Sequence, residues 1–90
     1  MTTFLVEAYV PESTELAAVE TRVRAAAAAL AQEGVEVVYV HSILVPGDAT
    51  CFHLVEAPSQ DVVVEVTRRA SMPFTRIVEA LSPSVEGGSR

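Results

Sequence analysis

Hydrophobic and polar residues alternate with a period of two in three stretches of this 90-residue chain: Thr3–Val10, Val35–Val45 and Thr50–Ala57. Alternation over such lengths, in segments rich in valine and aromatic residues, predicts β-strands. Pro11 ends the first strand because proline has no N–H for a ladder. A fourth strand is expected after Pro73, over Phe74–Leu81.

Two other stretches have helical periodicity. In Thr14–Glu33, apolar residues recur at steps of three and four, and Ala25–Ala29 adds five strong helix formers. Ser13 or Thr14 is a suitable N-cap, and Gly34 suits the left-handed position after the last turn. A second helix is predicted from the Ser59 cap to Ala70, with a buried stripe of Val62, Val66 and Ala70.

The predicted element order is therefore βαββαβ. Right-handed crossovers place both helices on one face of an antiparallel sheet with strand order 4-1-3-2. This is an α+β, ferredoxin-like sandwich. We expect one domain over residues 1–82 and a disordered tail over residues 83–90, where proline and glycine are frequent.

The hairpin Val35–Pro58 carries both histidines of the chain. His41 and His53 each lie six residues from Gly47 in its turn, so we predict that they face each other on one side of the sheet. Directly opposed residues have Cβ atoms about 4.5–5.5 Å apart, close enough to share one ion.

The positions of the bulkier apolar residues predict which side of the sheet the histidines share. We point Phe52 and Leu54 toward the helices, and with them Val38 and Val40. His41, His53, Tyr39 and Cys51 then lie on the open face of the sheet. Glu7 joins them there if Phe4, Val6 and Ala8 face the helices.

Charge narrows the range of partners. The net charge is −6, from twelve acidic residues against six basic ones, all arginine. Such a surface disfavours nucleic acid and anionic membranes and favours cations. Cys51 is the only cysteine, so no intramolecular disulfide forms. Neither a signal peptide nor a membrane span is evident, and we expect a cytoplasmic protein.

These residues suit a metal site. Imidazole and carboxylate ligands bind nickel and similar divalent transition metals, and a thiolate adds a softer ligand. The predicted ligands are His41, His53, Glu7 and Cys51. Two histidines that are simply hydrogen-bonded at an interface are the alternative interpretation.

The open face also predicts a partner. Leu5, Tyr9, Ile43 and Val55, together with Val37 and Tyr39, would form a larger apolar patch than monomers usually expose. We expect a homodimer that stacks the two sheets.

Several segments resemble a family of small bacterial ferredoxin-like proteins whose named members bind nickel. They are FLVEAYVP, the HS pair with its following I-L-V, CFHLVEAP, and RRASMPFTRIVEA. The resemblance implies a dimer that holds nickel, and it favours His41 and Glu7 as ligands. His53 stands where relatives carry cysteine, which changes the expected metal preference.

A different class of function is also open. Dimeric ferredoxin-like proteins include cofactor-free monooxygenases, isomerases and cyclases. In such an enzyme His41 or His53 would be the general base and Tyr9 or Tyr39 would orient a small hydrophobic substrate.

Overall fold

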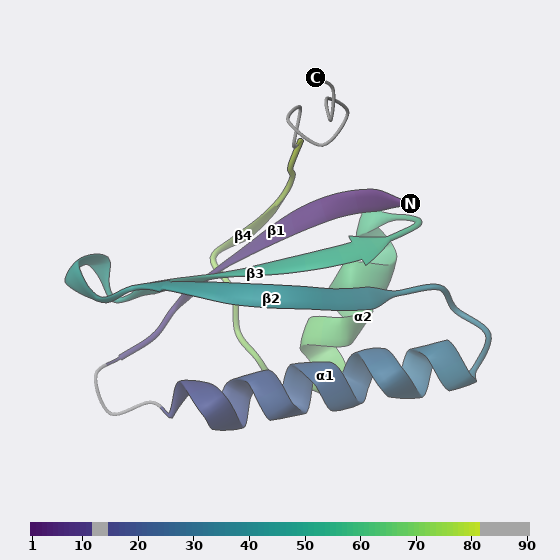
Figure 1. Ribbon diagram of the computed structural model, residues 1–90, viewed down its shortest axis with the longest axis horizontal. Helices are drawn as coiled ribbons and strands as arrows, with labels where there is room; N and C mark the ends of the chain where they lie inside the picture. The colour runs from purple at the N-terminus through teal and green to yellow at the C-terminus, as the bar shows by residue number, and fades with distance from the viewer. Residues whose placement is uncertain (12–14, 82–90) are drawn as a thin grey trace, which may run out of the picture.

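The computed structural model describes residues 1–11 and 15–81. Its elements follow the predicted order (Figure 1). The strands are β1 (Thr2–Tyr9), β2 (Val38–Val45), β3 (Thr50–Ala57) and β4 (Arg76–Glu79), and the helices are α1 (Leu16–Gln32) and α2 (Gln60–Arg69). A single 3-10 turn, η1 (Pro46–Asp48), joins β2 to β3 at the predicted hairpin turn. The predicted caps Ser13 and Thr14 and the predicted tail lie outside the described residues.

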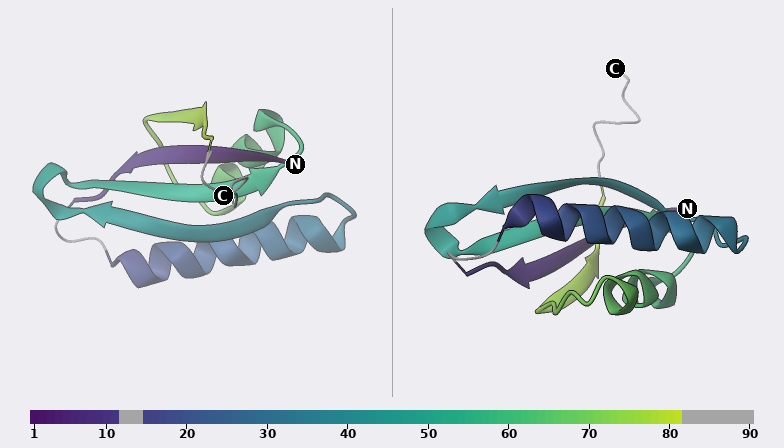
Figure 2. Two further views of the ribbon diagram at one scale, coloured as in Figure 1. Left: turned by 45° about the horizontal axis from the view of Figure 1, so that its top comes forward. Right: turned by 90° about the horizontal axis from the view of Figure 1, so that it is seen from below.

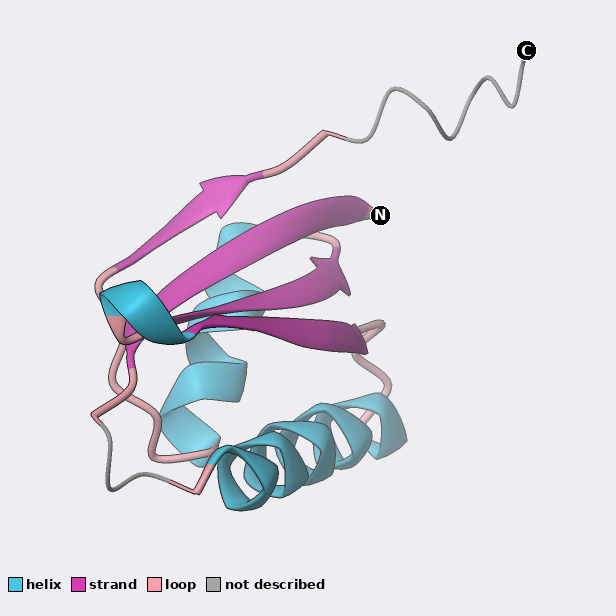
Figure 3. Ribbon diagram, turned by 60° about the vertical axis from the view of Figure 1, so that its left-hand side comes forward, coloured by secondary structure: helices cyan, strands magenta, loops and turns pink. Residues whose placement is uncertain are grey.

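The four strands form one sheet in the order β2-β3-β1-β4, and each neighbouring pair is antiparallel. Both helices lie on the same side of this sheet, and the other side is open (Figures 2 and 3). The ferredoxin-like prediction is confirmed. Strands β1 and β3 are central, while β2 and β4 are edges. Neither described helix is long and apolar enough to cross a membrane.

Helix α1 packs on the sheet through a stripe at three- and four-residue spacing. Its buried residues are Val19, Val23, Ala26, Ala27 and Leu30, as the periodicity predicts. The small alanine side chains let the helix backbone approach the strands closely. Gly34 follows the last turn with φ +93°, the left-handed conformation for which glycine is suited.

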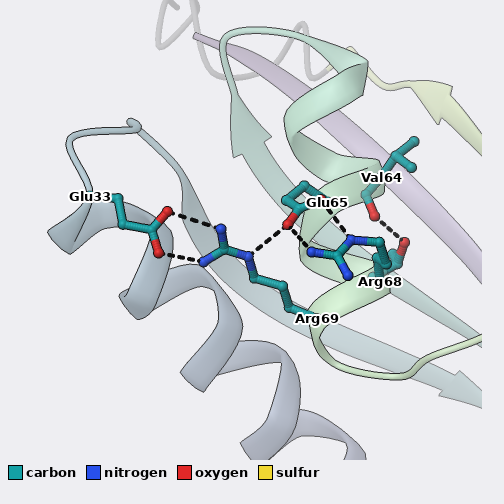
Figure 4. A network of polar contacts seen from close by, with 6 residues as sticks. Glu33, Val64, Glu65, Arg68 and Arg69 are labelled. Carbon is teal, nitrogen blue, oxygen red and sulfur yellow. Dashed lines mark hydrogen bonds and ion pairs between the residues drawn. The ribbon is translucent and has the colours of Figure 1, made fainter.

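Helix α2 forms although it contains several β-branched valines, because packing outweighs this weak local preference. Val63, Val66 and Ala70 are buried, so Val63 takes the place predicted for the half-buried Val62. Figure 4 shows how α2 is tied to α1. Both guanidinium NH groups of Arg69 donate to Glu33, at 2.7 and 2.9 Å.

The two faces of the sheet differ from our prediction in β3. Cys51, His53, Val55 and Ala57 are buried against the helices, and Phe52, Leu54 and Glu56 lie on the open face. Pointing Phe52 and Leu54 at the helices was therefore wrong. Strand β1 follows the prediction, with Phe4, Val6 and Ala8 in the core.

The orientation of β2 and of the residue before it also departs from our prediction. Val37 and Tyr39 are buried on the helix side, each 7% exposed, while Val38 and Val40 are exposed. The open face thus carries Leu5, Ile43, Phe52 and Leu54, and Val37, Tyr39 and Val55 do not belong to it.

Candidate metal site

His41 lies on the open face of β2 and its side chain is exposed. It is paired with Leu54 of β3, whose side chain is on the same face. Ile43, two residues further along, is 48% exposed. An imidazole within an apolar surface, free to reach a ligand, is suited to bind a transition metal.

Glu7 reaches the same face from β1. It is paired with Phe52 on one side and with Arg76 on the other. The Nε of Arg76 donates to Glu7 Oε1 at 2.8 Å, so the carboxylate already has one cationic partner. Strand β3 lies between Glu7 and His41, and their partners on it, Phe52 and Leu54, are two residues apart. Two strand spacings and a two-residue shift place the backbones of Glu7 and His41 about 12 Å apart.

His53 and Cys51 lie on the opposite side of the sheet, beneath the helices. His53 is 1% exposed and Cys51 is fully buried. His53 is paired with Ser42, and Cys51 with Leu44. The prediction that the two histidines face each other on the open side is therefore wrong.

A bulge in β2 accounts for the separation of the histidines. Tyr39 pairs with Val55, and the next pair along the two strands is His41 with Leu54. Val40 therefore has no partner on β3 and is the extra residue of the bulge. In an uninterrupted ladder His41 would pair with His53, as the symmetric spacing about the turn predicts. One extra residue moves every later side chain of β2 to the other face.

His53 instead belongs to a buried polar cluster that sequence reasoning missed, which we call the helix-side cluster: Glu20, Tyr39, Ser42 and His53. Ser42 Oγ lies 2.7 Å from His53 Nδ1 and also contacts the Tyr39 hydroxyl. That hydroxyl donates across 3.5 Å to Glu20 Oε2 on α1. The contacts form a chain from the core to the helix surface.

The directions of these hydrogen bonds fix the tautomer of His53. A carboxylate only accepts, so Tyr39 donates to Glu20, Ser42 donates to Tyr39, and His53 Nδ1–H donates to Ser42. Nε2 then carries the lone pair. It is buried and has no hydrogen-bond partner within the described residues. The centroids of the Tyr39 and His53 rings are 6.2 Å apart. The Arg24 guanidinium lies over the Tyr39 ring, with its Cζ 4.7 Å from the ring centroid.

Burial governs the ionisation of this cluster. It lowers the pKa of His53, with partial opposition from the Glu20 charge, so that the neutral imidazole is favoured. Burial also raises the pKa of Cys51 and of Tyr39, against a smaller lowering by Ser42. All three side chains are thus held in their neutral forms.

Within residues 1–11 and 15–81, no three His, Cys, Asp or Glu side chains converge closely enough to hold a metal ion. On the open face, the described strands therefore offer one imidazole, that of His41, and two carboxylates, those of Glu7 and Glu56.

The fold and the open face define the class: a small ferredoxin-like α+β protein with a single histidine on an uncovered sheet. The chain belongs to the family described as "Nickel responsive protein SCO4226-like", whose profile matches residues 4–80. The fold is also that of the crystal structure of SCO4226 from Streptomyces coelicolor A3(2). The TM-score is 0.68 at 21% identity, covering 89% of this chain and 98% of that one. No curated protein matches the chain.

Proposed function

We propose that this protein binds Ni²⁺, or a similar divalent transition metal, on the open face of its sheet as a homodimer. His41 is the leading ligand and Glu7 the second. The observation that carries the proposal is the exposed imidazole of His41 on that face, in a family described as nickel responsive.

Charge and chemistry support this assignment. A net charge of −6 raises the local concentration of cations at the surface. Imidazole and carboxylate together form a mixed site of the kind that nickel accepts. His53 and Cys51 lie under the helices, so the proposed open-face site does not include them.

The homodimer supplies what one protomer lacks. Val38, Ile43 and Tyr9 are 46, 48 and 67% exposed, and the half-buried Leu5, Phe52 and Leu54 lie beside them. Sheet-on-sheet packing buries such a face, and a two-fold axis brings a second His41 and Glu7 to it.

Calorimetric titration with Ni²⁺ tests the ligands. We expect binding tighter than about millimolar in the wild type, and at least a tenfold loss, about 1.4 kcal/mol, in His41→Ala. Glu7→Gln weakens binding less, because Arg76 already competes for that carboxylate. Glu79→Gln, on β4 beside Phe4, is the matched control and leaves affinity unchanged. Unaltered affinity in His41→Ala contradicts the assignment.

Light scattering tests the dimer. The wild type is expected to be a dimer at micromolar concentration, and Ile43→Glu a monomer, because it buries a charge in the interface. Val64→Glu is the control: Val64 is 39% exposed, but it lies on α2. A monomeric wild type removes the dimer from the proposal.

The enzyme alternative has one observation in its favour, the neighbouring rings of His53 and Tyr39. Their burial works against it, because a substrate has no access to an imidazole that is 1% exposed. A hollow of about 460 Å³ at the hairpin end is lined, among described residues, by Tyr9, Val10, Pro11, Leu16, Leu44, Pro46 and Ala49. That lining contains no general base for neutral pH, so metal binding is the better-supported function.

A further inference from the structure

The bulge in β2 brings together two side chains that a regular strand would separate. Tyr39 and Ser42 are three residues apart, so in an uninterrupted strand they would face opposite sides of the sheet. With Val40 inserted, both face the helices, and their hydroxyl groups are in contact.

The hydrophobic pattern of β2 does not by itself select this register. The segment VVYVHSILV is apolar at both odd and even positions, and Val38, Val40, Ile43 and Leu44 are all 37–48% exposed. The strand is also an edge, so only β3 constrains its pairing. Strands with two similar faces are prone to slip by one residue.

The competing register has a definite structure. Without the bulge, Val40 pairs with Leu54, His41 with His53, and Ser42 with Phe52. His41 then points beneath the helices and Ser42 toward the open face. The apolar residues of β2 exchange faces with one another, so the slip changes little in their burial. The polar contacts of Ser42, in contrast, are lost.

Those polar contacts therefore distinguish the two registers. Ser42 is in hydrogen-bond contact with His53 Nδ1 and with the Tyr39 hydroxyl, which in turn donates to Glu20. In the slipped register, Ser42 leaves His53 Nδ1 and the Tyr39 hydroxyl, and a second imidazole, that of His41, is buried beneath the helices in its place. Buried polar groups without their hydrogen bonds are destabilising, so this difference decides between two otherwise similar pairings.

We propose that Ser42, held by Tyr39 and His53, selects the bulged register of β2 and so keeps His41 on the open face. Ser42, Tyr39 and His53 are positioning residues for His41. Their effect on metal binding rests on the proposed function above, while their effect on the register does not.

Cross-strand nuclear Overhauser effects between β2 and β3 test the register without metal. Ser42→Ala is expected to weaken the His41–Leu54 contacts and to introduce His41–His53 contacts. Ser42→Thr keeps the hydroxyl and restores the wild-type pattern. Thr50→Ala is the matched control: it removes a hydroxyl in the same hairpin that donates to the Asp48 carbonyl in the turn and, within the described part of the chain, to no other group.

The Ni²⁺ titration is repeated on the same variants. We expect at least a tenfold loss of affinity in Ser42→Ala, and none in Ser42→Thr or Thr50→Ala. If the wild type binds no nickel, the proposed function fails and the register experiment still decides this inference. Wild-type cross-strand contacts in Ser42→Ala overturn it. If Ser42→Ala does not fold, Ser42→Cys takes its place, because a thiol is only a weak hydrogen-bond donor and acceptor, and the same outcomes apply.

Discussion

The two histidines of this chain lie on adjacent strands of one hairpin, and they have opposite surroundings. His41 is exposed on an apolar sheet face, and His53 is 1% exposed beneath the helices. A single extra residue, Val40, separates these two situations. Spacing about a turn therefore does not by itself show which side chains share a face.

The difference also separates two roles. An exposed imidazole keeps both nitrogens accessible to a ligand. His53 has its Nδ1 engaged by Ser42, and burial favours its neutral form. We therefore expect substitutions of His41 to change binding with little effect on folding, and substitutions of His53 to do the reverse.

Removing the two imidazoles in turn is expected to give the largest contrast. His53→Ala leaves a cavity and takes a partner from Ser42, and should lower the free energy of unfolding by about 2–4 kcal/mol. His41→Ala should change it by less than about 0.5 kcal/mol. Urea unfolding at one fixed protomer concentration measures both, because dimerisation makes stability depend on concentration.

Equal losses in the two variants would contradict the contrast. If His53→Ala does not fold, His53→Gln keeps a polar side chain of similar length. It should still be less stable than His41→Gln.

The pH dependence of stability should also distinguish the two residues. Burial lowers the pKa of His53 in the folded protein, so between about pH 6.5 and that lowered pKa the unfolded chain binds more protons. Stability should therefore fall as the pH drops below about 6.5, by at most about 1.4 kcal/mol per pH unit. Unfolding by urea at pH 7.5, 6.5 and 5.5 measures this slope.

His53→Gln is expected to lose the slope between pH 6.5 and 5.5, and His41→Gln to retain it. The ion-paired carboxylate of Glu65 does not obscure the measurement. Arg68 and Arg69 lower the pKa of Glu65 to about 2, so its contribution is lost only below about pH 4.5. The same slope in His53→Gln as in the wild type would show that another group is responsible.

The order of elements was predictable because hydrophobic periodicity is a local property of the sequence. The alternation in β1 and the stripe of α1 each identified their buried face correctly. In β3, side-chain bulk was the misleading signal, and Glu56 was the informative one. Glu56 shares a face with Phe52 and Leu54, so pointing those residues at the helices would also have buried a carboxylate.

The helix-side cluster was not predictable in the same way. Its members come from α1, β2 and β3, and they meet only once the bulge brings Tyr39 and Ser42 to one face. A bulge adds one residue without any necessary glycine or proline, so Val40 carries no local signal. One hint was available: Ser42, in a strand whose other residues are apolar apart from Tyr39 and His41.

A smaller effect is expected at the solvent end of the helix-side cluster. The Arg24 guanidinium lies over the Tyr39 ring at 4.7 Å. Arg24→Gln should reduce the free energy of unfolding by about 0.5–1 kcal/mol, which is typical of a cation–π contact at the surface. A double-mutant cycle with Tyr39→Leu isolates the contact. If the loss persists unchanged without the aromatic ring, the cation–π contact is not its source.

The smallest effect should come from the surface ion pairs at the helices, which contrast with the buried, neutral side chains of Tyr39 and His53. Arg69 binds Glu33, the residue that caps the C-terminus of α1, and Glu65 of α2. Among the described residues, Arg68 pairs only with Glu65 of its own helix (Figure 4). Arg69→Gln should lower the melting temperature slightly, and Arg68→Gln should lower it less. Only Arg69→Gln removes an ion pair between α2 and the end of α1. Solvent and salt screen exposed pairs, so the difference between the two variants should vanish near 1 M salt, where the screening length is about 3 Å. A loss that is independent of salt would show that Arg69 acts through packing of its aliphatic stem rather than through its charge.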